Sequence, residues 1–242
     1  MKFLDSKKSH EKEDHWIPLS DLMTGLMLIF LLIAMVFMVK LEQEKQVAEK
    51  AASQLRDIGT AYSNLRNRLY IDLFEEFKND LPKWRATLDK DLAIRFEEPE
   101  GQFRTGESIL QDPFKRILDS FAPRYVKILS NPTYAQSIEE IRIEGHTSSL
   151  WKDKTALAAY FENMRLSQDR TRSTLEYVAT RPNIGPAQKW LISKITAIGL
   201  SSSKLRFLPD GSEDTKSSQR VEFRVRLNAN EQMEKLLSGE SK

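Results

Sequence analysis

The sequence predicts a membrane protein of mixed class, with a single-pass transmembrane helix, a helical stalk and then an α+β soluble domain. An apolar run from Ile17 to Val39 is long enough to cross a bilayer. Apolar residues then recur at seven-residue spacing, and from Asp91 onward short strand patterns alternate with helical patterns. The mean hydropathy of −0.49 over the chain leaves that one run as the lipid-soluble segment. We therefore expect the remaining chain to lie mostly on one side of the membrane.

The predicted transmembrane helix covers residues 17–39, which would span roughly 35 Å against a hydrocarbon core of about 30 Å. Residues 1–16 are expected to form a cytoplasmic tail. Four lysines precede the helix and three follow it within about fifteen residues, which weakly favours an inside N-terminus. No small-residue cleavage site follows Val39, so the run is expected to be an uncleaved signal anchor.

Asp21 is the one charged residue between His15 and Lys40. An ionised Asp in the bilayer core costs about 2.5 kcal/mol or more, so such a residue normally faces a partner helix or a water-filled path. Thr24 lies on the same helical face and is small enough to let another helix approach. These features favour an ion relay. The alternative is that Ser20 or Asp21 caps the helix N-terminus.

The residues around Asp21 resemble the transmembrane helix of MotB-type stator subunits. Trp16 is followed by Asp21-Leu22-Met23-Thr24 and then by an apolar run containing Met27 and Phe30. The resemblance implies that Asp21 and Thr24 are ion-relay residues. It also implies that H⁺ or Na⁺ is the transported ion and that no cofactor is bound.

Residues 40–82 are expected to form the helical stalk. Apolar side chains occupy every seventh position at Leu41, Ala48, Leu55, Tyr62 and Leu69. This seam predicts a parallel dimeric coiled coil. The alternative is a single helix that packs its apolar stripe on its own domain or on a partner. Pro82 is expected to end the stalk.

The soluble domain is expected to cover residues 91–228, followed by a C-terminal tail at 229–242. Such a length can bury an independent core. The expected strands are Ala93–Phe96, Ile138–Glu144 and Arg220–Leu227, and the expected helices are Asp112–Leu129, Ala156–Thr180 and Gln188–Ile195.

Four segments of this domain resemble the OmpA-like, peptidoglycan-associating family. They are Gly101–Gly106, Ile141–Thr147, the pattern Asn163-x-x-Leu166-Ser167-x-x-Arg170, and Gln219–Glu222. The resemblance implies that Arg170 and an acid after Gly-His-Thr bind the charged ends of diaminopimelate in the wall peptide. It implies that Asn163 and Leu166 shape that pocket. An Arg suits the role because its fork of donors can bind a carboxylate bidentately.

Two positions depart from this family pattern. Ser148 occupies the position of the expected acid, and Glu162 stands where many members have Tyr. The alternative for Arg170 is a surface residue paired with Asp169 or Glu162. His146 is expected to be a strand-end hydrogen-bonding residue rather than a catalyst, because no nucleophile pattern accompanies it.

Other classes of function have little support in the sequence. There is no Walker loop, no dinucleotide-binding glycine pattern and no paired-carboxylate hydrolase signature, so no enzyme is expected. The net charge of +2 with mixed signs gives no nucleic-acid footprint. The chain has no cysteine, which excludes disulfides and thiolate metal sites.

Taken together, the membrane acid, the stalk and the divergent OmpA-like domain are most similar to the ZorB family of Zorya anti-phage systems. The resemblance implies an inner-membrane motor complex driven by the proton-motive force, with the soluble domain in the periplasm and bound to peptidoglycan. It implies five copies of a MotA- or ZorA-type membrane subunit around a dimer of this chain. A flagellar MotB-type stator and a passive envelope anchor are the alternatives, and gene neighbourhood would separate defence from motility.

Overall fold

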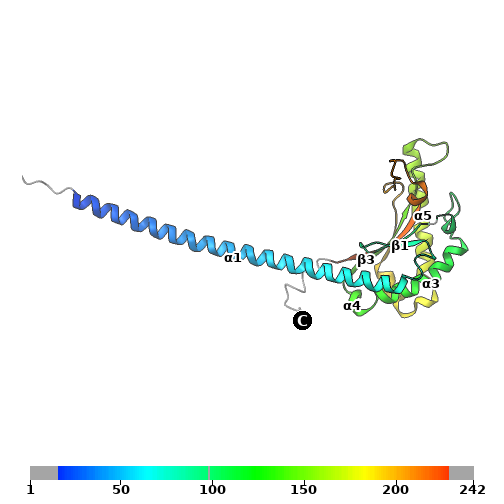
Figure 1. The fold of residues 1–242 in the computed structure, drawn as a ribbon, viewed down its shortest axis with the longest axis horizontal. Helices are drawn as coiled ribbons and strands as arrows, with labels where there is room; N and C mark the ends of the chain where they lie inside the picture. Colours follow the sequence, from blue (N-terminus) through cyan, green and yellow to red (C-terminus); the bar gives the residue numbers. More distant parts are fainter. Residues whose placement is uncertain (1–15, 98, 229–242) are drawn as a thin grey trace, which may run out of the picture. The chain divides into compact units, whose positions relative to one another are not determined.

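The computed structural model describes residues 16–97 and 99–228 of the chain. The predicted C-terminal tail, residues 229–242, lies outside the described residues. So do residues 1–15 of the predicted N-terminal tail. The chain divides into two compact units, residues 1–56 and residues 57–242. Helix α1 (Trp16–Phe77) is continuous and contributes to both (Figure 1). Within the described residues, α1 is the one helix long and apolar enough to cross a membrane.

In the first unit, the apolar side chains of α1 are exposed. From Leu22 to Val39, every large apolar residue has more than half of its surface accessible. A helix that is apolar all round and has no protein partner is suited to lipid or to other membrane helices.

In the second unit, the last turns of α1 belong to the core of the soluble domain. Leu69, Leu73 and Phe77 are completely buried there. The expectation that Leu69 lies on a seam between two chains is therefore wrong, because its side chain is enclosed by its own domain. A seven-residue spacing marks an apolar stripe on a helix but does not say what covers that stripe. The compact unit thus includes residues well before the expected start at Asp91.

Helix α1 ends at Phe77, before the expected stop at Pro82. The backbone N–H groups of Lys78 and Leu81 still donate to carbonyls of the last turn, at 2.7 and 2.9 Å. The chain then turns through Arg85, which has a φ of 46°, into the first strand. The helix therefore closes with a tight turn that leads directly into the sheet.

The second unit is built on a five-stranded sheet with strand order β1-β2-β5-β3-β4. The strands are β1 (Ala86–Leu88), β2 (Ala93–Phe96), β3 (Ile138–His146), β4 (Ile195–Gly199) and β5 (Arg220–Leu227). All pairs are antiparallel except β3 with β4, which run parallel.

The three strands expected from the sequence are confirmed as β2, β3 and β5, whereas β1 and β4 were not predicted. Both missed strands lie at the edges of the sheet, where β1 is short and β4 is only partly buried. The helix expected to reach Ile195 ends one residue earlier, because Ile195 pairs with Ile141 as the first residue of β4.

Two long helices, α3 (Asp112–Leu129) and α5 (Ala156–Ala179), confirm the expected helical segments. Helix α3 begins with Asp112 and Pro113, which favour a helix N-terminus. The Thr155 hydroxyl accepts a hydrogen bond from Ala158 N–H and caps α5. The shorter helices are α2 (Pro99–Gln102), α4 (Pro132–Ala135), η1 (Pro182–Ala187), α6 (Gln188–Lys194) and α7 (Thr215–Ser218).

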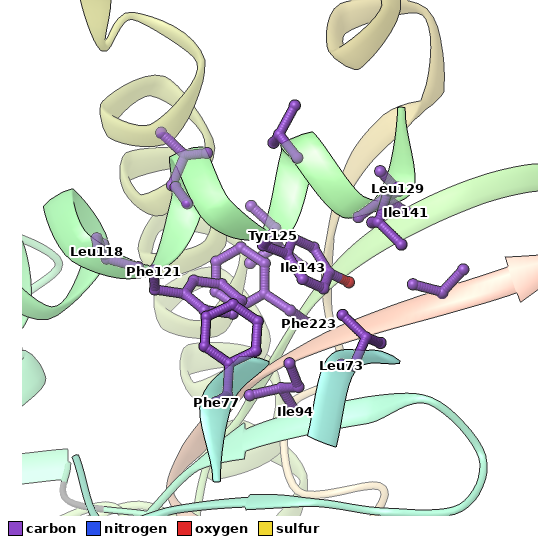
Figure 2. Close-up of a cluster of buried hydrophobic side chains, with 14 of the residues drawn as sticks. Leu73, Phe77, Ile94, Leu118, Phe121, Tyr125, Leu129, Ile141, Ile143 and Phe223 are labelled. Carbon is purple, nitrogen blue, oxygen red and sulfur yellow. The ribbon is translucent and has the colours of Figure 1, made fainter. Parts of the chain in front are cut away.

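The core lies between α3, the end of α1 and the apolar face of the sheet (Figure 2). Phe121 on α3 is at its centre, with ring centroids 5.1 Å from Phe223, 5.3 Å from Phe77 and 4.7 Å from Tyr125. Such tilted and stacked aromatic contacts add about 0.5–1.5 kcal/mol each beyond the area that they bury. The end of α1 is therefore tied to the domain by the same aromatic cluster that joins α3 to the sheet.

Candidate functional site

Two glycines let helix α5 lie directly on the ends of strands β3 and β4. A Cβ atom at Gly145 would be 2.6 Å from Thr171 Cγ2 and 2.8 Å from the Ser167 carbonyl oxygen. A Cβ at Gly199 would be 2.4 Å from the Gln168 backbone nitrogen. These distances are too short for any side chain to be accepted without movement of the helix. The glycine of the Gly-His-Thr segment is thus explained by packing.

A pocket of about 360 Å³ opens where this strand end meets α5. Ser148, Asn163, Leu166 and Arg170, the four residues expected to bind the wall peptide, all line it. The other lining residues are Thr105, Gly106, Thr147, Leu150, Trp151, Lys152, Thr215 and Gln219. The structure therefore brings the predicted residues together, while their ligand remains a prediction.

The guanidinium of Arg170 is buried in this pocket and held in a fixed orientation. Its Nε donates to the Glu107 carbonyl at 2.8 Å and its Nη2 to the Arg104 carbonyl at 3.1 Å. The guanidinium carbon lies 4.9 Å from the centroid of the Phe103 ring. Burial lowers the pKa of Arg170 to about 10, with no carboxylate beside it to oppose the shift. An anion is the ligand that such a group favours.

The alternative reading of Arg170 as a surface residue paired with a neighbouring acid is wrong. Asp169 pairs instead with Arg172 at 3.2 Å, and Glu162 pairs with Arg165 at 3.0 Å. Arg170 itself is 6% exposed. The helical spacing places Asp169 and Glu162 outside the pocket, so neither acid neutralises the buried guanidinium.

Small polar groups complete the lining of the pocket. The Thr147 hydroxyl is buried and has no hydrogen-bond partner among the described residues. Asn163 Nδ2 donates to the Leu150 carbonyl at 3.3 Å, which ties α5 to the loop after β3. A buried hydroxyl without a partner costs about 1–3 kcal/mol unless a ligand or water satisfies it. The pocket therefore offers polar contacts beside the cation.

In the first unit, Asp21 lies within α1 rather than at its end. Because α1 begins at Trp16, about one turn before Ser20, the alternative that Ser20 or Asp21 caps this helix is wrong. Asp21 is exposed on the single chain, and the Thr24 hydroxyl donates to the Ser20 carbonyl at 2.8 Å. The hydroxyl is thus engaged within the helix, and the relay role of Asp21 and Thr24 stays a prediction.

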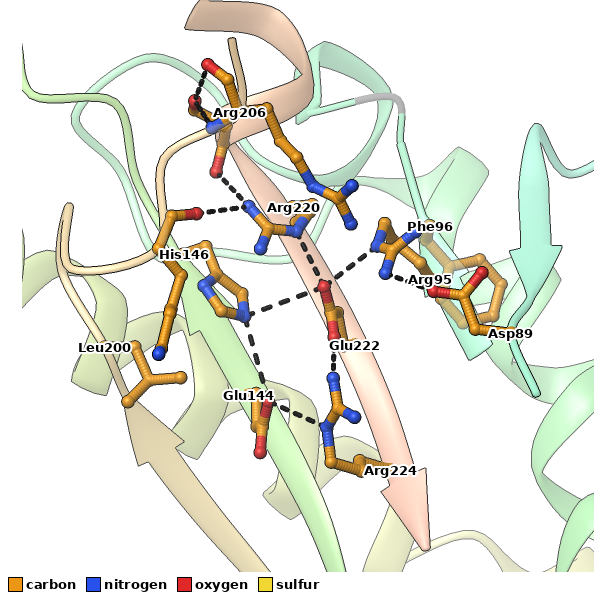
Figure 3. A network of polar contacts seen from close by, with 12 residues as sticks. Asp89, Arg95, Phe96, Glu144, His146, Leu200, Arg206, Arg220, Glu222 and Arg224 are labelled. Carbon is orange, nitrogen blue, oxygen red and sulfur yellow. Dashed lines mark hydrogen bonds and ion pairs between the residues drawn. The ribbon is translucent and has the colours of Figure 1, made fainter. Parts of the chain in front are cut away.

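Figure 3 shows a second cluster, made of charged residues. It lies on the sheet face opposite the aromatic core, because Arg95 and Glu222 alternate along their strands with the core residues Phe96 and Phe223. Its centre is Glu222, which is 1% exposed. Glu222 accepts hydrogen bonds from Arg220 Nε at 2.7 Å, Arg95 Nε at 2.9 Å and Arg224 Nη2 at 2.8 Å. Burial by itself raises the pKa of this carboxyl, but the hydrogen bonds from Arg95 and Arg220 outweigh it and hold the pKa at about 2.

His146 lies beside this cluster and makes no hydrogen bond to the described residues through either ring nitrogen. Its Nε2 is 3.8 Å from Glu222 Oε1 and 3.9 Å from a Glu144 oxygen. The expectation that His146 hydrogen-bonds at the strand end is therefore wrong. Burial, reinforced by the positive charge of Arg220, lowers the pKa of His146 to about 3 despite the nearby Glu222. The ring is neutral at physiological pH.

The ligand atoms of Glu144, His146 and Glu222 lie within 4.8 Å of one another, which is a possible metal-binding geometry. Arginines already contact both carboxylates, however: Arg224 Nε donates to Glu144 at 3.2 Å in addition to the bonds on Glu222. The positive charge of these arginines opposes the binding of a metal cation, so the cluster is better described as an ion-pair network. Alternating charges in Arg220-x-Glu222-x-Arg224 were the sequence signal for it, and the sequence reasoning missed them.

Known proteins include one similar sequence and several similar structures. No protein-family model matches it. It is 42% identical over 234 residues to the Zorya protein ZorB of Escherichia coli strain Crooks, a match that covers 95% of both chains. Similar solved structures include a putative MotB-like protein from Desulfovibrio vulgaris, with 22% identity, a TM-score of 0.49 and coverage of 72% of this chain and 95% of that one. Another is the cell wall anchor of the type VI secretion system (T6SS) from Pseudomonas aeruginosa, with 16% identity, a TM-score of 0.44 and coverage of 64% and 97%.

Proposed function

This chain belongs to the ZorB family of Zorya proteins, and from that premise we propose that it is an ion-conducting, stator-type subunit of an inner-membrane motor complex. The complex is driven by the proton-motive force, is anchored to peptidoglycan and acts in anti-phage defence. In this arrangement the N-terminus is cytoplasmic and the soluble domain is periplasmic. The chain works as a binding and conducting subunit rather than as an enzyme.

The observation that carries the proposal is the position of Asp21 in the apolar part of α1. The carboxylate is exposed on a helix whose large apolar side chains from Leu22 to Val39 are exposed as well. In hydrocarbon such a carboxylate is costly, and a partner helix or a water-filled path removes that cost. We propose that five MotA- or ZorA-type subunits around a dimer of this chain supply the partner. Asp21 then binds and releases H⁺ or Na⁺, and Thr24 lines the same path.

The pocket around Arg170 supports the second half of the proposal, anchoring to the wall. A buried guanidinium without a counter-ion is suited to a carboxylate, and wall peptides carry free carboxylates. Asn163 and Leu166 shape the space beside it, and Ser148 adds a neutral hydroxyl. A chain fixed to the wall holds the membrane helix still while the surrounding ring moves.

The test of the proposal is Asp21→Asn, which removes the charge and keeps the size of the side chain. The full chain is co-expressed with its ring-forming partner in cells, and the purified complex is reconstituted into liposomes. We expect the variant to assemble but to lose ion flux and phage protection. Asp57→Asn, at an exposed acid outside the apolar run, is the matched control and should retain both. Normal protection by Asp21→Asn would favour the passive anchor, and restored swimming in a strain that lacks its own stator would favour the flagellar alternative.

A further inference from the structure

The pocket around Arg170 has positive charge and no acid in its lining. Of its lining residues, Arg170 and Lys152 are the ionisable ones, and no lining residue among the described part of the chain is Asp or Glu. Lys152 is exposed at the rim, whereas Arg170 is buried at the inner wall. A ligand that enters therefore meets two cations and a set of neutral hydroxyl and amide groups.

The acids that neighbour lining residues in the sequence, Glu107, Asp153, Glu162, Asp169 and Asp214, are not themselves part of the lining. Glu213 accepts from the backbone N–H of Ser149 at 3.0 Å and from the hydroxyl of the same residue. Asp214 accepts from Lys216 N–H at 3.2 Å and Ser217 N–H at 3.1 Å, where it caps α7. Neither Glu213 nor Asp214 lines the pocket.

Arg170 and Thr147 differ in the hydrogen-bonding groups that they leave unused. Nε and Nη2 of Arg170 are used by the Glu107 and Arg104 carbonyls, and its Nη1 makes no hydrogen bond to a described residue. The hydroxyl of Thr147 is 98% buried as a residue and unpartnered among the described side chains. The guanidinium thus keeps unused N–H donors, whereas the Thr147 hydroxyl is enclosed by its neighbours.

We propose that this pocket discriminates between two forms of one ligand. It prefers the form in which a free carboxylate lies beside an acylated amine over the form in which the amine is a free ammonium. This inference rests on the wall anchoring proposed above. In chemical terms the preferred form is the diamino acid of a cross-linked wall peptide, whose side-chain amine forms an amide. An ammonium at that place would lie near Arg170, and the pocket lining supplies no carboxylate to pair with it. Acylation removes the charge and leaves an amide N–H and C=O, which the Ser148 hydroxyl in the lining can bind.

The test uses two synthetic stem peptides that contain diaminopimelate and differ only in acetylation of its side-chain amine. Binding to the full chain in detergent is measured by calorimetry and by the fluorescence of Trp151, which lines the pocket. We expect the acetylated peptide to bind more tightly. Ser148→Asp should reverse the preference, because the new carboxylate can pair with the free ammonium. That ion pair should raise the affinity for the free-amine peptide about tenfold or more.

Two further variants separate ligand binding from folding. Arg170→Gln should weaken both peptides about tenfold or more. Arg172→Gln, on the same helix with a side chain that is 67% exposed and paired with Asp169, should change neither. Tighter binding of the free-amine peptide to the unmodified chain would overturn the proposal, as would a Ser148→Asp chain that keeps the original preference.

Sedimentation with purified sacculi distinguishes this inference from the function on which it rests. If the chain sediments with sacculi but binds neither peptide, or prefers the free amine, the inference fails and wall anchoring stands. If the chain does not sediment with sacculi at all, both fail. Sacculi from cells with a higher degree of cross-linking should retain more of the chain, which gives the inference a readout in the intact wall.

Discussion

Arg220 donates a 2.7 Å hydrogen bond from its Nε to the carboxylate of Glu222, two residues later in the same strand, and both side chains are almost completely buried. Alternate residues of a strand lie on one face of a sheet, so this spacing brings the two groups together. Arg95, from the neighbouring strand β2, completes the pair. Ion pairs therefore connect the strands on this face of the sheet, whereas aromatic side chains pack on the other face.

Glu222→Gln is expected to destabilise the soluble domain by about 3–5 kcal/mol, because it leaves buried arginines without their shared counter-ion. Chemical unfolding of the detergent-solubilised chain, followed by circular dichroism, measures the change. Glu139→Gln is the matched control, since its carboxylate is half exposed and lies 3.7 Å from Arg226. That control should cost less than about 1 kcal/mol. Equal losses of unfolding free energy in the two variants would contradict the larger contribution expected of the buried carboxylate.

Acid is expected to destabilise the domain through His146. The pKa of this ring is lowered from 6.5 to about 3 in the folded chain. Between these values the unfolded chain binds a proton that the folded chain does not, so unfolding becomes easier as the pH falls through this window. The free energy of unfolding should decrease by up to about 1.4 kcal/mol per pH unit for this one proton. His146→Gln should flatten the slope between pH 6.5 and 4.5.

Below pH 4.5 Glu222 adds to the same trend. Its pKa is lowered from 4.5 to about 2 on folding, so its stabilising effect is complete above pH 4.5 and is lost as the pH falls toward 2. The slope in this lower range should therefore persist in His146→Gln and be reduced in Glu222→Gln. Unfolding measured at half-unit intervals from pH 7 to pH 3 separates the two groups. A slope that is the same in all three proteins would contradict both assignments.

Gly145→Ala is expected to disrupt the pocket, because the new Cβ would lie 2.8 Å from the Ser167 carbonyl of α5. Overpacking of this kind typically costs about 1–3 kcal/mol, and here it also pushes the helix that carries Arg170. We expect weaker retention on sacculi together with a lower melting temperature. Gly59→Ala is the control: a Cβ there would meet no atom within 4 Å beyond the adjacent backbone of α1, so the change should leave retention unchanged and not lower stability. Unchanged retention by Gly145→Ala would mean that the pocket does not depend on this close approach.

The dimeric stalk stays a prediction, now confined to the part of α1 before the soluble domain. Leu41 and Leu55 are exposed on the single chain, at 61% and 65%, and are free to face a second copy. Single-cysteine variants at these two positions should form disulfide-linked dimers under mild oxidation, because matching positions meet in a parallel coiled coil. The chain has no cysteine of its own to interfere. Asp57→Cys on the outer face and Leu69→Cys in the core should not crosslink; equal crosslinking at every position would indicate random collision.

The candidate pocket could be predicted from the sequence only in part. The motif spacing in α5 identified Asn163, Leu166 and Arg170 as candidate binding residues. The helical repeat places them on one face. That Arg170 is buried without a counter-ion could not be read in this way. It depends on the carbonyls of Arg104 and Glu107, which are 66 and 63 residues away in the chain. Trp151 and Lys152 join the pocket through the loop after β3, whose path is decided by packing.

By itself the sequence determined the features that depend on local periodicity. The apolar run with Asp21, the helices at Asp112–Leu129 and Ala156–Ala179 and the three inner strands β2, β3 and β5 follow from spacing and from residue type. The tertiary structure alone decided what covers each apolar stripe and which charges meet. It enclosed Leu69 in the chain's own core rather than between two chains, and it joined Arg95 to Glu222 across 127 residues. The reason is physical: backbone propensity acts within a few residues, whereas burial and ion pairing are set by contacts between segments that only the complete fold brings together.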